Sequence, residues 1–209
     1  MVKISAFQSL IPEIKFISQV PTKAYSNYSK SDLDLEIKNN PYSFLNIIAK
    51  NEKINPEKRL SYIRDKIDHF KKKMILKTQR KKSIYIYRKT DLKNTYTGLI
   101  CAISLKDYAN KKIKVHEKTI KRRELLFAEY LKTTKIYAEP VLMTIDGELN
   151  KIIDKHIENT KKTYNFHTND GVQHEIWEIK KNEDISHIIS FFDTVQNLYI
   201  ADGHHRMAS

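Results

Sequence analysis

Glycine and proline are scarce in this chain, and their scarcity constrains the fold more than any single motif does. The 209 residues contain four glycines and five prolines, so each of them marks a turn or a helix start clearly. The long segments between them follow helical spacing in some places and strand-like patterns in others. Because helices and paired strands alternate in mixed order, we predict an α+β fold, a mixed sheet with hairpins and flanking helices.

The clearest helix signal lies in NPEKRLSYIRDKIDHFKKKMIL, residues 55–76. Asn55 is a good capping residue and Pro56 suits the first helical position. The segment 39–48 is predicted as a turn leading into a strand, and 163–181 as a hairpin with a type I′ turn at Asn169-Asp170-Gly171. Further helices are predicted from about 121, at 147–162 and at 183–195, and further strands at 83–90, 98–105 and 139–145.

Composition excludes several classes of protein. Cys101 is the only cysteine, which rules out an internal disulfide framework and a cysteine-based zinc site. The first residues lack the features of a signal peptide, and no run is long enough to span a membrane, so we expect a cytoplasmic protein without a membrane partner. We expect two regions, residues 1–110 and 111–209, and allow for a homo-oligomer.

The formal charge of +13 raises the question of nucleic acid. Only seven of the 38 basic residues are arginine, whereas the recognition of phosphates and bases favours the arginine fork. The make-up of the charge therefore argues against a nucleic-acid partner. It favours anionic small substrates such as nucleotides.

The sequence DGHHR, residues 202–206, follows the apolar run NLYIA. Gly203 would let the backbone approach an anion closely, and Arg206 could bind phosphate oxygens in a bidentate manner. Asp202 would repel phosphate unless a hard cation lay between them, which points to Mg²⁺. Two other interpretations stay open at this point, an ordinary polar turn and a transition-metal site at His204 and His205.

A second candidate is HEKT, residues 116–119, which precedes KRRELLFAEYL. Cations surround Glu117, so its carboxylate would stay ionised, as a general base must. Thr119 is able to cap the following helix. Arg122 and Arg123 at the helix start oppose its dipole, a local conflict that fits an anionic partner. The alternative is an ordinary solvated helix start.

The remaining histidines, His156, His167, His174 and His187, are scattered, although His167 and His174 flank the predicted hairpin. A cross-strand metal pair there is the less favoured interpretation, and exposed strand residues are the simpler one. The sequence contains no glycine-rich Walker loop or dinucleotide-binding loop. A nucleotide site, if present, must therefore be built in another way.

Taken in order, NNPYSFLNII, YIYRKT, TGLICAISLKDY, IKVHEKT, AEPVLMT and LYIADGHHRMAS resemble a widespread prokaryotic family of unknown function. That family is related to free serine kinases of the SerK type, in the ParB/sulfiredoxin superfamily. The resemblance covers nearly the whole chain. It implies a ParB/sulfiredoxin-like phosphate-binding core in residues 111–209, and a continuation beyond residue 209 that is absent from this sequence.

The resemblance also implies an activity, the transfer of the terminal phosphate of ATP or ADP to the hydroxyl of free L-serine. By its match to the family's HE box, Glu117 would be the base. The DGHHR box would bind phosphates and Mg²⁺ through Asp202, Gly203, His204, His205 and Arg206, while the roles of Arg122 and Arg123 are inferred from their position alone.

The chain departs from its relatives in one place and from other superfamily members in two. VPTKAYSNYS stands where many relatives carry Pro-Pro-Tyr-Asp, so we assign no role to that loop. His204 occupies the place of the sulfiredoxin cysteine, which leaves sulfiredoxin chemistry without its nucleophile. No helix-turn-helix of the ParB type is evident. The alternative function is nevertheless a ParB-like nucleotide- or DNA-binding module without kinase activity.

Overall fold

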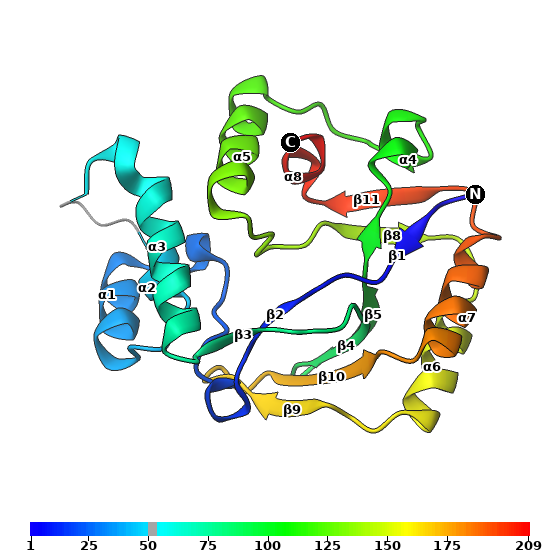
Figure 1. Ribbon diagram of the computed structural model, residues 1–209, viewed down its shortest axis with the longest axis horizontal. Coiled ribbons are helices and arrows are strands. Elements are labelled where there is room, and N and C mark those ends of the chain that lie inside the picture. Colours follow the sequence, from blue (N-terminus) through cyan, green and yellow to red (C-terminus); the bar gives the residue numbers. More distant parts are fainter. Residues whose placement is uncertain (50–53) are drawn as a thin grey trace.

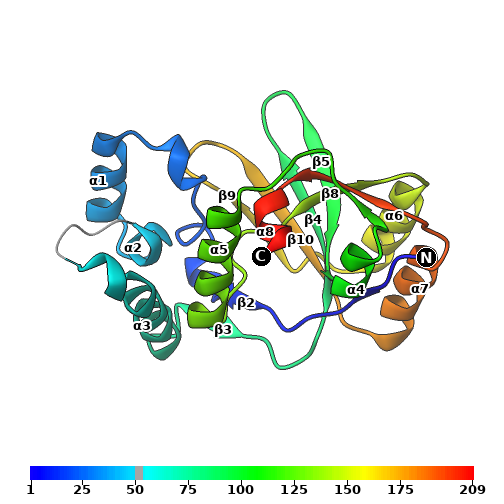
Figure 2. The same ribbon diagram turned by 90° about the horizontal axis from the view of Figure 1, so that it is seen from above.

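The computed structural model describes residues 1–49 and 54–209. Within these ranges it contains eight α-helices and several small sheets in mixed order, which confirms the α+β class. Helices α1, α2 and α3 form a group on one side, α6 and α7 lie on the opposite side, and the sheets lie between them (Figures 1 and 2). These helices span Lys30–Asn39, Leu45–Ile48, Arg59–Lys72, Leu149–Asn159 and Asn182–Phe192, respectively.

The largest sheet has four antiparallel strands in the order β5-β4-β10-β9. The hairpin predicted at 163–181 is present in it as β9 and β10, and the predicted strands at 83–90 and 98–105 form another hairpin, in which β4 pairs with β5. The turn between β9 and β10 differs from the type I′ prediction: within it only Gly171 has positive φ, at 77°, whereas type I′ needs two such residues. The four strands are Ile84–Thr90, Thr95–Ile100, Tyr164–His167 and Gln173–Ile179.

A three-stranded sheet in the order β7-β11-β8 carries the two candidate motifs. Its central strand β11 (Leu198–Asp202) runs parallel to β7 (Ile113–Lys114) and antiparallel to β8 (Leu142–Ile145). Parallel strands end at the same edge of a sheet, where ligands of open α/β sheets commonly bind. The segments that follow β7 and β11, which contain HEKT and DGHHR, therefore meet at one edge.

Two strand pairs complete the sheets. β1 (Ile4–Ser5) pairs with β6 (Ala102–Ile103), and β2 (Leu10–Pro12) pairs with β3 (Leu76–Thr78). The predicted strand 98–105 is thus divided: it ends as β5 at Ile100, continues in another sheet as β6, and gives way to helix α4 (Leu105–Ala109). An apolar run alone does not show that its strand changes sheets.

Two hydrophobic clusters form the interior. The larger one joins both main sheets to α6 and α7, with Ile84, Ile86, Ile153, Ile188 and Ile200 among its fully buried members. The smaller one gathers side chains of α2, α3 and β3. The boundary expected near residue 110 stays a prediction; strands from its two sides share a sheet, because β4 pairs with β10 over seven residue pairs.

The predicted helix at 55–76 begins later and ends earlier than expected. Pro56–Lys58 form a 3-10 turn, at whose start Asn55 Oδ1 accepts the Glu57 N–H at 3.0 Å. The α-helix α3 follows from Arg59, without a side-chain cap at Lys58. The helix then closes in a Schellman motif: Met74 is left-handed (φ 55°), and the Ile75 N–H donates to the Phe70 carbonyl at 2.9 Å. Burial of Ile75 and Phe70 in the smaller cluster stabilises this helix end, and the chain continues directly into β3 at Leu76.

The prediction of a strand within 39–48 is wrong. The segment forms a turn followed by the short helix α2, with Leu45 and Ile47 fully buried. An apolar run of this length does not distinguish a strand from one turn of buried helix. Here the packing against α3 decides the outcome.

Candidate functional site

The DGHHR loop is a sharp turn from β11 into a short helix. Gly203 adopts φ 95°, and α8 (His204–Ala208) starts directly after it. A Cβ at position 203 would lie only 2.8 Å from Arg206 Nη2. Glycine is needed at this position for two reasons: it tolerates the left-handed backbone conformation, and its lack of a side chain leaves room for the Arg206 guanidinium.

The HE segment lies against this loop, as the parallel strands require. The Glu117 Oε2 atom lies 3.6 Å from His204 Nδ1. The His116 ring meets the His204 ring edge-on, with 4.4 Å between the centroids and 85° between the planes. The Glu117 side chain is 57% exposed and that of His204 only 3%. An accessible carboxylate thus stands above a buried imidazole, and the two motifs form one cluster.

The other ring nitrogen of His204, Nε2, is buried and makes no hydrogen bond within residues 1–49 and 54–209. A buried polar group left unsatisfied costs about 1–3 kcal/mol, so native structures rarely retain one without a reason. A ligand or a water molecule that reached this nitrogen would remove the cost.

His205 connects the loop to helix α5 (Lys121–Thr134). Its Nε2 accepts the backbone N–H of Ile120 at 3.1 Å, which places the proton of the neutral ring on Nδ1. The side chains of Arg122 and Arg123, in the first turn of α5, are exposed. The structure therefore places both arginines on the surface, two and three residues after the Ile120 contact with His205.

Thr119 does not cap α5 as expected. The residue at the cap position is Ile120, and the Thr119 hydroxyl instead donates to the Glu124 carboxylate. Glu124 also pairs with Lys121 Nζ at 3.0 Å. The hydrogen bond from Thr119, together with the lysine, lowers the pKa of the Glu124 carboxyl. The acidic group that stabilises this helix start is thus Glu124.

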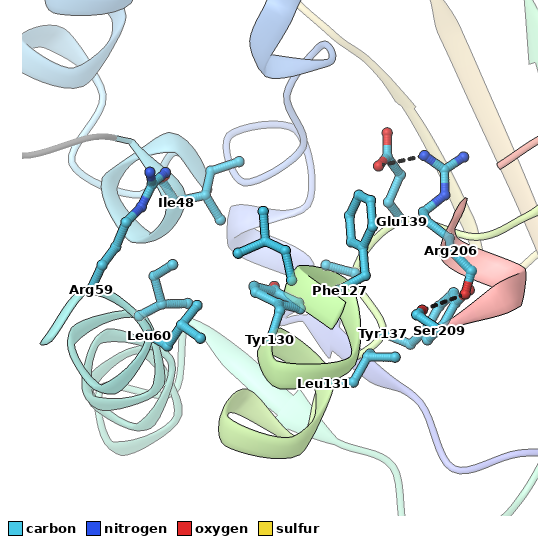
Figure 3. A pocket seen from close by; sticks show the side chains of 13 residues that line it. Ile48, Arg59, Leu60, Phe127, Tyr130, Leu131, Tyr137, Glu139, Arg206 and Ser209 are labelled. Atoms are coloured by element: carbon cyan, nitrogen blue, oxygen red, sulfur yellow. Dashed lines mark hydrogen bonds and ion pairs between the residues drawn. The ribbon is translucent and has the colours of Figure 1, made fainter. Parts of the chain in front are cut away.

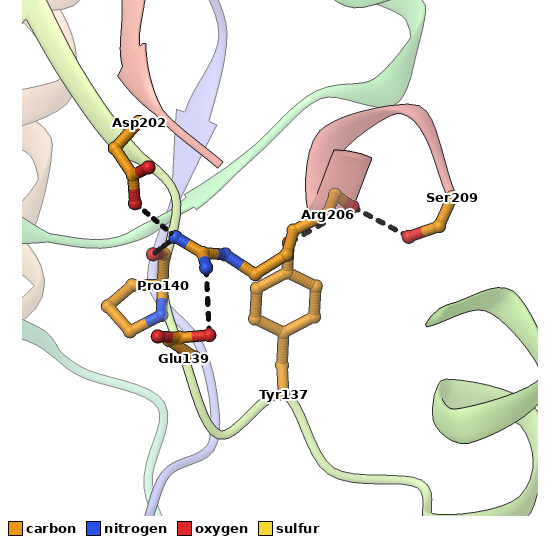
Figure 4. A network of polar contacts seen from close by, with 6 residues as sticks. All are labelled: Tyr137, Glu139, Pro140, Asp202, Arg206 and Ser209. Atoms are coloured by element: carbon orange, nitrogen blue, oxygen red, sulfur yellow. Dashed lines mark hydrogen bonds and ion pairs between the residues drawn. The ribbon is translucent and has the colours of Figure 1, made fainter. Parts of the chain in front are cut away.

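Arg206 is held by two carboxylates (Figure 4). Its Nη1 donates to Glu139 Oε2 and its Nη2 to Asp202 Oδ2, both at 2.7 Å, and Nη2 also reaches the Pro140 carbonyl at 3.3 Å. The Tyr137 hydroxyl donates to the Arg206 carbonyl at 3.3 Å. A phosphate at this arginine would have to share it with the two carboxylates.

Sequence reasoning did not identify Glu139 or Tyr137. The available signal was position: Glu139 stands just before β8, the antiparallel neighbour of β11, and Leu142 of that strand pairs with Asp202. A polar residue before one strand is thereby brought opposite the end of the other. Without the strand order, which the sequence does not state, this signal could not be used.

The charges of the loop decide what it can hold. Among the described residues no group of three or more His, Cys, Asp or Glu side chains is arranged to hold a metal ion, so a transition-metal site has no support. Mg²⁺ differs, because it commonly takes one or two protein carboxylates and completes its shell with phosphates and water. The Asp202 side chain, 71% exposed with Oδ2 turned to Arg206, fits that role together with a bound nucleotide.

Three of the other histidines form hydrogen bonds within the protein. His156 and His187 share a hydrogen bond of 3.3 Å between α6 and α7, and His174 bonds to Tyr87 and Thr168 at 2.7 and 3.1 Å. His174 lies opposite Phe166, and His167 opposite Gln173. Neighbouring pairs point to opposite faces of a sheet, so the cross-strand metal pair does not form.

The single cysteine also lacks the properties of a nucleophile. Burial raises the pKa of the Cys101 thiol to about 12, whereas reactive cysteines have a lowered pKa.

No helix in the described parts of the chain has the length and apolar character needed to cross a membrane.

Comparison with known proteins identifies a family. The family model described as "Protein of unknown function (DUF1015)" matches residues 4–209. No curated protein and no solved structure matches the chain.

Proposed function

This chain belongs to the DUF1015 family of proteins of unknown function, and from its own residues we propose that it is a kinase for a small hydroxyl compound. The proposed reaction transfers the terminal phosphate of ATP or ADP to the hydroxyl of free L-serine and gives O-phosphoserine. One observation carries the proposal: the Glu117 carboxylate lies 3.6 Å from the buried His204 imidazole of a glycine turn. A base and a phosphate-binding loop are the parts that phosphoryl transfer needs.

The proposed roles follow from exposure and hydrogen bonding. Glu117 accepts the hydroxyl proton, since its carboxylate is open to a small substrate. The Nε2 of His204, which makes no hydrogen bond within the described residues, and the Nδ1–H of His205 bind phosphate oxygens beside the glycine backbone at 203. Arg206 neutralises phosphate charge from the other side of the loop, and Arg122 and Arg123 extend the basic surface.

The chemical step balances without any further reactant. The serine hydroxyl oxygen forms a bond to the terminal phosphorus as the bond from that phosphorus to the bridging oxygen breaks. The bridging oxygen keeps the electron pair and leaves with the shortened nucleotide, and the hydroxyl proton passes to Glu117. Mg²⁺ held by Asp202 and the phosphates would supply neutralisation of the negative charge at the loop, where Asp202 and Glu139 otherwise outnumber Arg206.

Serine as the acceptor, and a ParB/sulfiredoxin-like core around the loop, rest on the resemblance of the HEKT and DGHHR segments to SerK-type kinases. The geometry adds support for a small acceptor in general. Glu117 lies three residues after β7, and its side chain is 57% exposed beside the loop, so that a compact substrate can reach the carboxylate.

The test is a direct assay of the full chain with ATP or ADP, Mg²⁺ and L-serine, followed by ³¹P NMR. We expect O-phosphoserine to form and Glu117→Gln to reduce the rate by about 100- to 10,000-fold, the range of a general base. Glu129→Gln, which alters an exposed glutamate of α5, is the matched control and should keep full activity. Undiminished turnover in Glu117→Gln would refute the role of the base.

A second candidate is a nucleotide- or DNA-binding module without kinase activity. Its support is a basic run: seven of the twelve residues 71–82 are lysine or arginine, and most of them are exposed. Backbone-directed DNA binding of this kind weakens steeply with salt. Failure of the chain to bind duplex DNA even at low salt would remove the DNA-binding form of this candidate.

A further inference from the structure

A cavity of about 310 Å³ lies between α3 and α5 and opens beside α8 (Figure 3). Its wall is largely apolar and includes Leu60, Phe127 and Tyr130. One end is formed by Glu139 and Arg206, and Arg59 stands at the other end. The volume is at the lower end of the range for ligand pockets, about 300–1,000 Å³, so the cavity suits one flat part of a ligand rather than a whole nucleotide.

The cavity is continuous with the DGHHR loop through one side chain. Arg206 lines the cavity, and its guanidinium also packs over Gly203 and pairs with Asp202. A ligand whose phosphates lie at the loop would therefore extend past Arg206 into the cavity. We infer that this cavity binds the base of the donor nucleotide; the inference rests on the proposed function and specifies where its donor lies.

The chemistry of the wall matches the parts of a nucleoside in order. Glu139, whose side chain is 61% exposed, stands at the junction, where its carboxylate can accept hydrogen bonds from ribose hydroxyls, a common use of acidic residues in nucleotide sites. Phe127 and Tyr130 offer aromatic surface for a planar base. Arg59 can donate to ring acceptors or stack on the far edge of the base.

The same wall argues against the acceptor. Free serine carries an ammonium and a carboxylate on a very small frame, and burying either charge without a partner is costly. The apolar side chains of the wall, among them Leu60 and Phe127, cannot pair with them, and the charged groups Arg59 and Glu139 stand at opposite ends of the cavity. Serine therefore belongs at the open side of the loop beside Glu117, and the cavity belongs to the nucleotide.

The experiment compares ATP with inorganic tripolyphosphate, which has phosphates but no base, by calorimetry on the full chain with Mg²⁺. We expect ATP to bind about tenfold or more tightly, the scale of stacking one base. Leu60→Trp fills the cavity and should remove this advantage while tripolyphosphate affinity stays unchanged. Leu35→Trp, at an exposed leucine of α1, is the control and should behave like the parent. If Leu60→Trp unfolds, Phe127→Ala serves as the second variant, with the same loss expected for ATP only.

Each other result overturns the inference in a distinct way. Equal affinities for ATP and tripolyphosphate in the parent chain would reject a base site and leave the phosphate loop intact. An advantage of ATP that persists in both cavity variants would place the base elsewhere. Binding of neither compound would reject the proposed function together with the inference.

Discussion

His204 and His156 are equally buried, each 4% exposed, yet they lie in different surroundings. His156 is enclosed by α6 and α7, where Nε2 bonds to His187 and Nδ1 faces Asp184 at 3.9 Å. His204 has Glu117 at 3.6 Å from one nitrogen and nothing within hydrogen-bond reach of the other among the described residues. The first is a satisfied core histidine. His204 has the features of a binding residue, because the described residues supply no hydrogen-bond partner for its Nε2.

The strongest test of this contrast compares two single variants, in each of which one of the two histidines is replaced with leucine. His204→Leu should reduce kinase activity by at least about 100-fold, because a side chain that hydrogen-bonds to the phosphates is lost. The stability of the protein should change little. His156→Leu should keep activity but lower the free energy of unfolding by about 1–3 kcal/mol, because His187 loses its partner. Urea denaturation and the kinase assay measure the two effects. Equal loss of stability in both variants would show that His204 is an ordinary core residue.

A second test concerns the backbone that presents His204. Gly203→Ala should lower the free energy of unfolding by about 1–3 kcal/mol, because alanine is strained at φ 95°. The new methyl group would also displace the Arg206 guanidinium, 2.8 Å away, and weaken nucleotide binding. Gly98→Ala is the matched control, since a Cβ there meets no atom within 4 Å. Similar stability of the two variants would contradict the strain at Gly203.

The third and smallest effect is the dependence of stability on pH. Burial lowers the pKa of His156; His187 and Lys155 lower it further, and Asp184 partly opposes the shift. Burial likewise lowers the pKa of His174; Lys89 and His167 lower it further, and Asp170 partly opposes the shift. The unfolded chain then binds more protons, so stability is full above the unfolded histidine pKa of about 6.5 and falls as pH drops below it. Urea midpoints at pH 7.5 and 5.5 measure this loss, which should be smaller in His156→Leu than in the parent. An unchanged pH dependence in His156→Leu would show that His156 does not contribute.

Much of the site could be predicted because its parts are local. The glycine turn, the start of α5 and the two hairpins each follow from a few neighbouring residues. Glu139 could not be predicted, because its position depends on the pairing of β8 with β11. The same holds for α2, where burial of Ile47 against side chains of α3 outweighs any local preference. Contacts between distant segments set these features, and the pattern of a single segment does not contain them.

The parallel pairing of β7 with β11 has a consequence for the order of folding. It joins Ile113 and Lys114 to Leu198 and Tyr199 through only two residue pairs, and the loop that it closes contains most of the second half of the chain. Closing such a loop carries an entropic cost before its contacts form, and non-local contacts slow folding. The hairpins can form early from neighbouring residues, whereas Glu117 and His204 meet only when this long loop closes. The contact between Glu117 and His204 is thus expected among the last native contacts to form, after most of the secondary structure is in place.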